Sequence, residues 1–542
     1  MSSVTEFIRR KEAVCCPICR ALIRNNLGQH IRDTHGEEDY RQAILRAKEC
    51  GVSDSEIGSL FGVAFKQLEK IITDAYGVNV SALEKPKAVK FWTPENFVEE
   101  TTSVWSFKQR GNWATHSGRY RGNWSPYIPR NVILKYSRPG DVVLDYFVGG
   151  GTTAVEAKLL GRQCIASDIN PACIRLTLEN LDFQPPNVLF REFPIYEPKV
   201  FVADARNLSH ISDNSIDLIC AHPPYASIIN YSSGVEGDLS NLRVDDFLKE
   251  MKKVAKESYR VLKPGGKCAI LIGDTRQRKH VVPIGFQTIN VFLESRFKLK
   301  ELVIKRQHNC KTTGFWYAKS IRNNFLLLAH EYLPIFEKPR PSQPPLLARE
   351  EMLRYGEVSS ELKKLSLKRK LPELETTTVW LLPDDDFEKR LNKNVVDRYS
   401  GGRGYLTVDF VSHSRSEGRF HERQGQKSRG LLFIKSSFLA DSPSRLDVES
   451  YLEKIQTVIK QELSGINKGG FLVIQAQDVR LNGYIEPVAK KIVDSIAFDD
   501  LWLKEIVVVT QGQKQRDSTK DMPSTEGLSI THQYLVIYEK VL

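Results

Sequence analysis

A histidine and a tyrosine flank two adjacent prolines in the stretch His222-Pro223-Pro224-Tyr225. The apolar run that precedes them, residues 216–221, predicts a buried strand. Proline has no N–H group to donate to a neighbouring strand, so the predicted strand must end at this corner. The pattern therefore places an imidazole and a phenol, two side chains that can do chemistry, at a rigid corner at the end of a strand.

Three consecutive glycines, residues 149–151, follow a predicted strand at 142–147 and precede a predicted helix at 152–160. They permit a tight turn and a close approach of the backbone to a ligand. A glycine loop alone is a weak signal, because several kinds of nucleotide-binding site share it. The next predicted strand ends in Asp168, where a carboxylate can reach both hydroxyls of an adenosine ribose, and a further strand ends in Asp204. The acidic strand end therefore sharpens the prediction of a nucleotide-type site.

Two cysteines and two histidines lie near the N-terminus as Cys16-x2-Cys19-x10-His30-x4-His35. Two thiolates on a turn and two imidazoles on one face of a helix make a tetrahedral Zn²⁺ site. The pattern resembles a C2H2 zinc finger with a slightly short middle spacer, and Cys15 is a substitute ligand. A finger of this kind binds nucleic acid or protein, and the spacing does not say which.

Residues 53–76 predict two short helices with Gly62 in the turn between them, which is helix-turn-helix spacing. If this segment docks on DNA, its exposed candidates for contact are Lys66, Gln67 and Lys70. An ordinary helical hairpin fits the same pattern equally well, so both interpretations stay open.

The composition bounds the class of protein. The 542 residues are too many for one core, so several domains are expected, and 41% hydrophobic with 27% charged residues is typical of soluble domains. We expect a cytoplasmic protein without a membrane partner, because no run approaches the roughly 20 apolar residues of a membrane helix. Nine scattered cysteines favour a reducing compartment, and the net charge of +12 suits a polyanionic partner without proving one.

Four segments, LDYFVGGGTT, SDIN, VADA and HPPY, resemble motifs I, II, III and IV of the S-adenosylmethionine-dependent DNA amino-methyltransferases that modify cytosine N4 or adenine N6. The segment 104–137 resembles motif X of that group, so the order of motifs is similar to the family's gamma arrangement. The resemblance covers about residues 90–335. It implies an α/β fold with a Rossmann-like class I methyltransferase domain.

The resemblance implies that S-adenosyl-L-methionine binds at these strand ends. Asp168 would hold the ribose hydroxyls, Ile169 would lie against the adenine, and Asp204 would accept from the adenine amino group. The full set of implied cofactor-binding residues is Asp145, Phe147, Gly149, Gly150, Gly151, Thr152, Asp168, Ile169 and Asp204.

In the family, two hydrogen-bond acceptors make an exocyclic amine nucleophilic: the first side chain of motif IV and the carbonyl of its first proline. These roles fall here to His222 and Pro223, while Pro224 completes the corner and Tyr225 stacks on a flipped-out base. The family usually has Asp, Asn or Ser where this chain has His, so the usual clue to cytosine or adenine is lost. A neutral imidazole has one acceptor nitrogen and an imidazolium has none, so we expect activity to fall in acid, near the ordinary histidine pKa of roughly 6.5.

A long internal repeat lies outside the motifs. The segments 247–276 and 451–480 align without a gap at an offset of 204 residues. No glycine loop followed by an acidic strand end is apparent in the second copy, so we expect a degenerate methyltransferase-like lobe that binds no cofactor. Many enzymes of the resembling group work as pairs of subunits. We therefore expect this lobe to form an intramolecular pseudo-dimer with the methyltransferase domain.

The predicted organisation has five parts. They are a zinc finger at 1–40, a helix-turn-helix-like segment at 41–85, a methyltransferase domain at 86–338, a linker at 339–395 and the degenerate lobe at 396–542.

Three expectations concern double-stranded DNA as a partner. Asp274 ends a predicted strand on the side of the site and is expected to face the target. The cationic stretch 276–280 is read either as a phosphate contact or as an ordinary solvated charge run. The basic segment Arg415–Arg429 of the second lobe is expected to face the DNA path.

The leading functional prediction is a site-specific methyltransferase acting on an exocyclic amine of cytosine or adenine in DNA. One alternative is a methyltransferase acting on tRNA or rRNA, because some such enzymes carry similar Pro-Pro-Tyr sites. The other is a DNA-binding protein that keeps an inactive methyltransferase fold.

Overall fold

The structure is a computed structural model. It describes residues 14–23, 26–50, 52, 54–77, 89–116, 118, 120, 122–184, 194–225, 235–308, 314–341, 354–363, 374–413, 428–435, 444–511 and 527–542.

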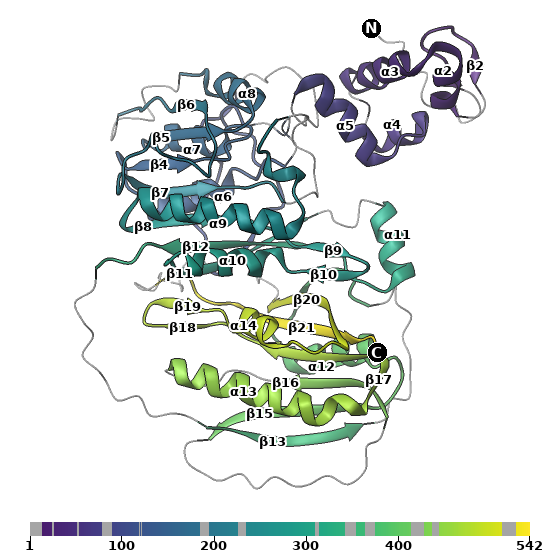
Figure 1. The fold of residues 1–542 in the computed structure, drawn as a ribbon, viewed down its shortest axis with the longest axis vertical. Helices are drawn as coiled ribbons and strands as arrows, with labels where there is room; N and C mark the ends of the chain where they lie inside the picture. Colours follow the sequence, from purple (N-terminus) through teal and green to yellow (C-terminus); the bar gives the residue numbers. More distant parts are fainter. Residues whose placement is uncertain are drawn as a thin grey trace. The chain divides into compact units, whose positions relative to one another are not determined.

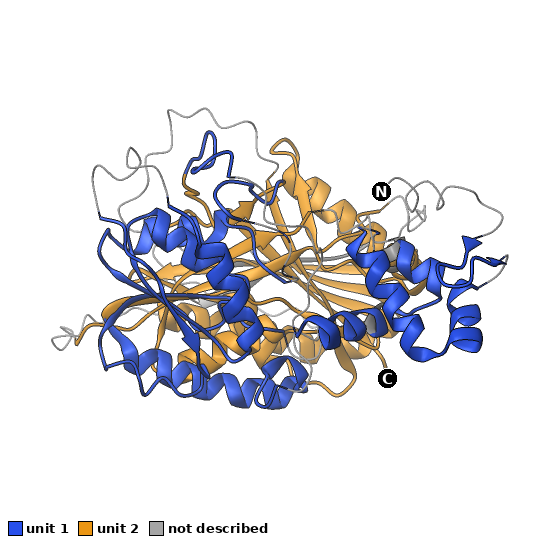
Figure 2. Cartoon of the chain, turned by 90° about the horizontal axis from the view of Figure 1, so that it is seen from above, with its two compact units in different colours: residues 1–98, 109–263 blue, residues 99–108, 264–542 orange. Residues whose placement is uncertain are grey.

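The chain divides into two compact units, which Figure 2 colours separately. Unit 1 comprises residues 1–98 and 109–263, and unit 2 comprises residues 99–108 and 264–542. The division falls inside the methyltransferase domain predicted at 86–338, so residues 99–108 and 264–338 belong to the same unit as the C-terminal part of the chain.

The N-terminal part of unit 1 is a short hairpin followed by four helices (Figure 1). The elements are β1 (Val14–Cys15), β2 (Leu22–Ile23), α2 (Leu27–His35), α3 (Glu37–Glu49), α4 (Asp54–Phe61) and α5 (Phe65–Tyr76). The Asn26 side chain caps α2 by accepting from the backbone N–H of Gln29, and Gly62 makes the turn between α4 and α5 with φ +62°. Apolar side chains from all four helices form one buried cluster.

The rest of unit 1 is a parallel sheet with helices between its strands. The strands are β4 (Val142–Asp145), β5 (Gln163–Asp168), β6 (Lys199–Val202) and β7 (Ile216–Ala221), in the order β7-β4-β5-β6. The helices are α6 (Tyr127–Tyr136), α7 (Thr152–Leu159), α8 (Pro171–Leu181) and α9 (Val244–Val261). All three strand pairings are parallel, so the carboxyl ends of these strands share one edge, where ligands bind in open α/β sheets.

The first part of unit 2 contributes strands in the order β3-β11-β12-β8. Its elements are β3 (Val104–Ser106), β8 (Leu262–Ile270, which contains the boundary between the units), β9 (Thr275–Gln277), β10 (His280–Val282), α10 (Ile284–Glu294), β11 (Lys298–Arg306), α11 (Gly314–Asn323) and β12 (His330–Glu337). Strand β11 pairs in parallel with β3 and antiparallel with β12.

The C-terminal part of unit 2 is a seven-stranded sheet in the order β13-β15-β16-β17-β21-β20-β14. Its strands are β13 (Arg354–Lys363), β14 (Val379–Leu382), β15 (Tyr405–His413), β16 (Arg429–Lys435), β17 (Ile466–Ala476), β20 (Leu501–Gln511) and β21 (His532–Lys540). A hairpin of β18 (Val479–Leu481) with β19 (Tyr484–Glu486) and the helices α12 (Phe387–Tyr399), α13 (Arg445–Glu462) and α14 (Val488–Ser495) complete it.

One sequence expectation about this region needs correction. The stretch 339–395, predicted as a linker, contains β13 and β14, the two edge strands of the seven-stranded sheet, and the first part of α12. The α/β class is confirmed. Within the described residues, no helix combines the length and apolar character that crossing a membrane requires.

Candidate active site

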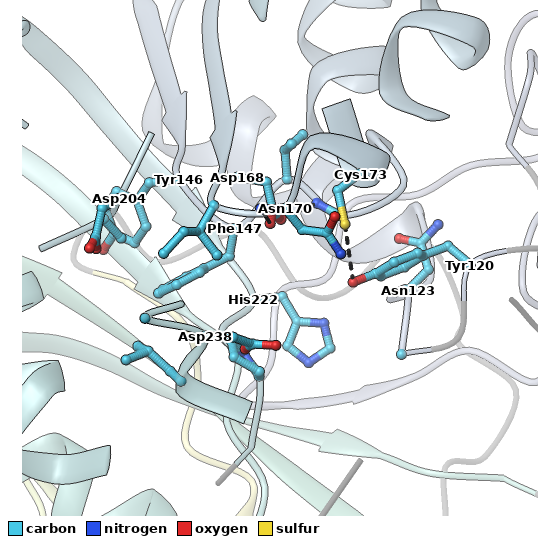
Figure 3. Close-up of a pocket in the computed structure, with 18 of the residues that line it drawn as sticks. Tyr120, Asn123, Tyr146, Phe147, Asp168, Asn170, Cys173, Asp204, His222 and Asp238 are labelled. Atoms are coloured by element: carbon cyan, nitrogen blue, oxygen red, sulfur yellow. Dashed lines mark hydrogen bonds between the residues drawn. The ribbon is translucent and has the colours of Figure 1, made fainter. Parts of the chain in front are cut away.

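A pocket opens in unit 1 at the carboxyl ends of the parallel strands (Figure 3). Seven of the predicted site residues line it: Phe147, Gly149, Asp168, Ile169, Asp204, His222 and Pro224. The structure therefore brings the glycine turn, both acidic strand ends and the Pro-Pro corner around one cavity. Six other predicted residues, Asp145, Gly150, Gly151, Thr152, Pro223 and Tyr225, are not among the residues that line it.

The glycine turn needs glycine for two separate reasons. Gly149 and Gly151 have φ of +51° and +84°, a left-handed region that other residues rarely adopt. A Cβ atom on Gly149 would also lie 2.7 Å from the ring of Tyr120, and one on Gly150 would lie 3.0 Å from Cβ of Tyr120. The turn is thus packed directly against Tyr120, which lines the pocket.

Asp168 links the turn to the end of β5. Its Oδ2 accepts a hydrogen bond from the backbone N–H of Gly149 at 3.0 Å, and its Oδ1 accepts from the N–H of Asn170 at 3.0 Å. Burial raises the pKa of Asp168 to about 6, with a further contribution from the nearby charge of Asp238, although the two backbone donors oppose the shift. The carboxyl is therefore held in place and costly to ionise.

Asp145 lies behind the pocket wall, with 2% of its surface exposed. Its Oδ1 accepts from the backbone N–H of Phe147 at 3.0 Å, which shapes the turn at the end of β4. Burial raises the pKa of Asp145 to about 7, against a hydrogen bond from Thr153 that lowers it. In this structure Asp145 positions the turn and does not face the cavity.

Asp204 is held by a guanidinium group. Arg206 Nε lies 2.9 Å and 3.0 Å from the two carboxylate oxygens of Asp204, and Arg206 Nη2 lies 2.6 Å from Oδ2. Arg206 also donates to Glu250 Oε2 at 2.6 Å. Burial would raise the pKa of Asp204, but the hydrogen bonds and charge of Arg206 outweigh it and lower that pKa. Asp204 is therefore a fixed carboxylate at the end of β6.

Thr152 acts on the pocket through a neighbour. Its hydroxyl is buried and donates to Oδ1 of Asn123, a residue that does line the pocket. The carbonyl groups of the turn are also occupied, because Thr177 donates to the carbonyl of Gly149 at 3.1 Å and Asn180 donates to that of Gly150 at 2.7 Å. Helix α8, which carries both donors, thus holds the glycine turn through two hydrogen bonds.

The Pro-Pro corner follows β7 as predicted. The ring of His222 stacks on Trp124, with centroids 5.4 Å apart and ring planes at 24°. His222 Nε2 lies 2.8 Å from the hydroxyl oxygen of Tyr225, and which atom donates depends on the imidazole tautomer. The side chain expected to accept from the target amine, His222, and the side chain expected to stack on the base, Tyr225, therefore contact each other in this structure.

The sequence analysis missed twelve residues of the pocket wall, among them Tyr120, Asn123, Trp124, Asn170, Cys173 and Asp238. The first three lie in the segment that resembles motif X, which was identified without assigning roles to its side chains. Asn170 follows Asp168 directly and caps α8 by accepting from the N–H of Ala172, an N-cap signal that was available from Asn-Pro. Asp238 and Cys173 carry no local signal, because they reach the pocket only through the fold.

A buried carboxylate ties the motif X segment to the helix after the glycine turn. Glu156 on α7 accepts from Trp113 Nε1 at 2.6 Å, from His116 Nε2 at 2.7 Å and from Arg130 Nη1 at 2.9 Å. Burial would raise the pKa of Glu156, but its partners, His116 first, lower it overall. This network holds the segment that supplies Tyr120, Asn123 and Trp124 to the pocket.

The four predicted metal ligands form a group at the N-terminus. One ligand atom from each of Cys16, Cys19, His30 and His35 lies within 4.8 Å of all the others. Cys19 Sγ lies 3.3 Å from His30 Nε2, and Cys16 Sγ lies 3.8 Å from His35 Nε2. Ligands of a tetrahedral zinc ion are about 3.5 Å apart, so the arrangement fits such an ion. Cys15 is not part of the group.

The N-terminal helices reach the wall of the pocket. Asn170 Nδ2 donates to the carbonyl of Gly77 at 2.8 Å, at the end of α5. Ala172 and Cys173 belong to the same buried apolar cluster as the side chains of the N-terminal helices. Two residues that line the pocket, Asn170 and Cys173, are therefore held partly by the N-terminal region.

Asp274, which was expected to face the target, has both carboxylate oxygens engaged within unit 2. Its Oδ1 accepts from the N–H of Gly285 at 2.9 Å, at the start of α10, and its Oδ2 accepts from the hydroxyl of Tyr332 at 3.3 Å. The expectation that it faces the target stays a prediction.

Two residues of the cationic stretch 276–280 are committed to contacts within unit 2. Arg276 forms an ion pair with Glu505, and His280 Nε2 lies 3.1 Å from Glu539 Oε2. Only the turn residues Arg278 and Lys279, together with Gln277, are exposed. Of the segment 415–429, expected along the DNA path, only residues 428 and 429 lie within the described part of the chain, and the side chain of Lys66 lies outside it.

Comparisons with known proteins agree with the motifs. A family described as DNA methylase matches residues 64–179 and 216–429, more than half of the chain. A tRNA (guanine(10)-N2)-dimethyltransferase of Methanothermobacter thermautotrophicus is 31% identical over 217 residues, which are 38% of this chain and 56% of that protein. The Type II methyltransferase M.MthZI of the same organism is 25% identical over 162 residues, which are 27% of this chain and 46% of that protein.

The chain spans about half the length of these two relatives. Among solved structures, TrmN from Thermus thermophilus is 19% identical, with a TM-score of 0.27 over 40% of this chain and 50% of that one. The extent of the family match, which includes the glycine turn, Asp168 and the Pro-Pro corner, decides the assignment. The chain belongs to the DNA methylase family.

Proposed function

We propose that this protein transfers a methyl group from S-adenosyl-L-methionine to an exocyclic amine of cytosine (N4) or adenine (N6) in double-stranded DNA. The observation that carries the proposal is the pocket itself. It joins the glycine turn after β4, Asp168 after β5 and the corner at His222 after β7 in one cavity. Strands β4 and β7 are adjacent and parallel, so a methyl donor on the turn and an amine at the corner would share that cavity.

The donor side of the pocket suits a nucleoside that carries a positive charge. S-adenosyl-L-methionine would supply an activated methyl group on a sulfonium ion. Asp168 and Ile169 both line the pocket. Asp168 would accept hydrogen bonds from the ribose hydroxyls, and Ile169 would offer an apolar face to the adenine. Asp204 is an ionised acceptor at the next strand end, because Arg206 keeps it charged. Asp145 supports this site from behind, through the turn.

The acceptor side would hold the target amine. The lone pair of an exocyclic amine is delocalised into the base, and two acceptors that bind its N–H groups would localise it. Pro223 supplies a backbone carbonyl and His222 supplies a ring nitrogen in the neutral form. The methyl group would pass in line from sulfur to nitrogen, S-adenosyl-L-homocysteine would leave as a neutral thioether, and the nitrogen would lose its extra proton to solvent water, so catalysis is mostly positioning.

The contact between His222 and Tyr225 gives the proposal a specific step. With the proton on Nδ1, the Tyr225 hydroxyl donates to Nε2 and occupies the acceptor that the amine needs. An entering base would take over this acceptor while the phenol ring moves to stack on the base. Trp124, stacked on His222, would keep the imidazole plane fixed during the exchange.

RNA is the second candidate substrate, and one observation favours it. The relative with 31% identity is named as a tRNA dimethyltransferase that acts on a guanine N2 amine, whereas other relatives are named as Type II methyltransferases. An inactive methyltransferase fold that binds DNA is the third candidate, because histidine replaces the usual residue at the first position of motif IV.

Labelled S-adenosyl-L-methionine separates the three candidates. The protein is incubated with the labelled donor and with duplex DNA or total RNA, and the product is digested to nucleosides. The Asp168→Ala variant serves as the matched inactive control. Label in N4-methylcytosine or N6-methyladenine from DNA supports the proposal, label from RNA alone replaces DNA by RNA as the substrate, and no label with either leaves the inactive fold.

We also propose that Cys16, Cys19, His30 and His35 bind a structural Zn²⁺ ion and that the N-terminal region contributes to DNA binding. The ligand atoms are close enough for a tetrahedral site, and small domains of this kind owe their stability to the metal. The test is metal analysis of the purified protein, followed by the Cys16→Ser/Cys19→Ser variant. We expect about one zinc ion per chain, lost in the variant together with affinity for DNA. A full zinc content in the variant would contradict the ligand assignment.

A further inference from the structure

Unit 2 contains the same arrangement of strands twice. The first four strands run β3-β11-β12-β8, and four strands of the seven-stranded sheet run β14-β20-β21-β17. In both sets the edge strand pairs in parallel with its neighbour, and the next pairing is antiparallel. Along the chain, β8 is followed by the hairpin of β9 and β10 and then by α10, and β17 is followed by the hairpin of β18 and β19 and then by α14.

The correspondence extends to single residues. The pairing of β11 with β12 shifts register between Leu299 and Glu301, and the pairing of β20 with β21 shifts between Leu503 and Glu505. These bulges lie 204 residues apart, the offset of the sequence repeat. Bulges are specific local features. Two unrelated sheets would not be expected to place them at matching positions.

The two sets of strands define two halves of unit 2, residues 99–108 with 264–338 and residues 374–542. Each half has an arginine that forms an ion pair with a glutamate of the other half. Arg276 of the first half pairs with Glu505 of the second, and Arg480 of the second half pairs with Glu301 of the first. Both arginines and both glutamates are related by the same offset of 204. Both glutamates are buried, with 2% and 1% of their surfaces exposed. The exchange is reciprocal, which is the signature of a two-fold contact between equivalent surfaces.

The backbone repeats the same exchange. Thr102, just before β3, forms a parallel bridge with Ser529, just before β21. Thr377, just before β14, forms a parallel bridge with Leu327, just before β12. Each half therefore adds its own edge segment to the other half.

Buried histidines complete the pattern. Ser103 Oγ lies 2.7 Å from Nδ1 of His532, and Thr378 Oγ1 lies 2.9 Å from Nδ1 of His330. Each histidine starts the last strand of its own half and contacts the hydroxyl of the other half. Two equivalent residues also contact each other directly. Asn290 Nδ2 lies 3.3 Å from Asp494 Oδ1, and the two residues are again 204 positions apart.

We propose that residues 374–542 are a built-in second subunit, which fills a two-fold dimer surface formed by residues 99–108 and 264–338. The partner that this surface fits is a copy of the same fold, and the chain supplies that copy itself. The inference is independent of the methyltransferase activity. It explains why charged groups are buried between the halves, since each ion pair is completed only by the other half.

Cutting the connection between the halves tests the association. Residues 344–349 of the full chain are replaced by a protease recognition sequence, and the purified protein is cleaved and passed over a sizing column. We expect the two fragments to elute together at the mass of the intact chain. Fragments that elute separately would show two tethered domains and would overturn the proposal.

Double-mutant cycles test the two-fold relation. Arg276→Met and Glu505→Gln are combined, as are Arg480→Met and Glu301→Gln, and Tm is measured for every variant. Each single change is expected to lower Tm by roughly 5–10 °C, because it leaves a buried partner unpaired. Each double variant should lose less than the sum of its two single losses, by a similar amount in the two cycles.

The control cycle combines Arg276→Met with Glu301→Gln, both from the first half, and its losses should add. Coupling in only one of the two cross-pairs, or equal coupling in the control, would contradict a two-fold contact. Where a variant does not fold, the cleavage experiment still decides the association.

Discussion

Strands β4 and β15 have similar positions in their sheets, but the chain continues differently after the aspartate that each carries. Each pairs in parallel with the strand that follows it across the sheet, β4 with β7 and β15 with β16, and each carries an aspartate, Asp145 or Asp409. After Asp145 the chain turns through three glycines, whereas β15 runs on to His413. On its other side β4 has a parallel neighbour, β5, and β15 has an antiparallel neighbour, β13.

This difference shows what a cofactor pocket needs beyond a sheet. Strand β5 arrives in parallel after a helix, so its carboxyl end and Asp168 lie beside the turn after β4. The antiparallel β13 brings its amino end to the carboxyl end of β15. Within the described residues, β15 continues as a strand for four residues after Asp409, where the chain after Asp145 has already left β4. The parallel sheet of unit 1 therefore has the features of a donor site, and we expect none in residues 374–542.

The largest expected effect is at the Pro-Pro corner. His222→Ala and Tyr225→Ala should each lower the methylation rate by at least about 100-fold, because an acceptor or a stacking surface for the base is lost. Affinity for S-adenosyl-L-methionine should stay within about twofold. The matched change in the second half is Lys435→Ala, at the end of β16, and it should leave the rate unchanged. A loss of methylation rate in Lys435→Ala as large as in His222→Ala would contradict the assignment of the chemistry to the Pro-Pro corner alone.

Tyr225→Phe sharpens this prediction. The variant keeps the aromatic face and loses the hydroxyl that contacts His222 Nε2. We expect its rate to stay within about tenfold of the parent, since stacking is retained. A loss as large as that of Tyr225→Ala would assign the hydroxyl an essential role.

The next effect concerns donor binding. Asp168→Ala should raise the dissociation constant for S-adenosyl-L-methionine at least about tenfold, because lost hydrogen bonds to buried hydroxyls correspond to about 1–3 kcal/mol. Asp409→Ala, in the second half, should leave it unchanged. Titration calorimetry measures both, together with the number of donor molecules per chain, which we expect to be one. A value of two would mean that the second half also binds.

Donor binding should also depend on pH. The pKa of Asp168 is raised to about 6, and the proposed contact with ribose hydroxyls needs the ionised carboxylate as acceptor. Affinity should therefore weaken as pH falls from 7 to 5, by up to about tenfold per unit below pH 6. The stability of the protein without donor should change with pH in the opposite direction. A carboxyl group whose pKa is raised in the folded state adds to the free energy of unfolding at low pH, and this contribution is lost as pH rises. An affinity for the donor that is flat from pH 5 to 7 would exclude this role.

The smallest effect compares Asp274 with Asp478. Burial raises the pKa of each to about 7, and each accepts from a backbone N–H eleven residues later, in Gly285 and Ala489. The stability that each gives at low pH is lost as pH rises through 7. Asp274→Asn and Asp478→Asn remove the charge, so both variants should melt a few degrees above the parent at pH 8 and no higher than it at pH 5. Shifts of opposite sign in the two variants would contradict their equivalence.

The sequence predicted best what depends on neighbours in the chain. The glycine turn, Asp168 and the end of β7 follow from local patterns, and β4 ends two residues earlier than expected. The edge strands β13 and β14 were read as linker, because their pairing partners lie about 50 and 130 residues further along the chain. Trp124 and Asp238 could not be found for the same reason, since only the folded chain brings them to the pocket.

The repeat shows where such reasoning stops. An offset of 204 aligns α10 with α14 and the hairpins before them. It does not reveal that Arg276 and Glu505 touch, because a repeat specifies equivalent positions within each copy and not the contacts between copies. The reciprocal pairing needed the three-dimensional arrangement of unit 2.

The early segment at Thr102 and Ser103 has a consequence for synthesis. Ser103 contacts His532, which lies 429 residues later in the chain, so this bond cannot form until β21 has been made. Contacts of such long range slow folding. A chain that stops before β21 would leave Ser103 without this contact, so correct folding of this segment should depend on β21 being made.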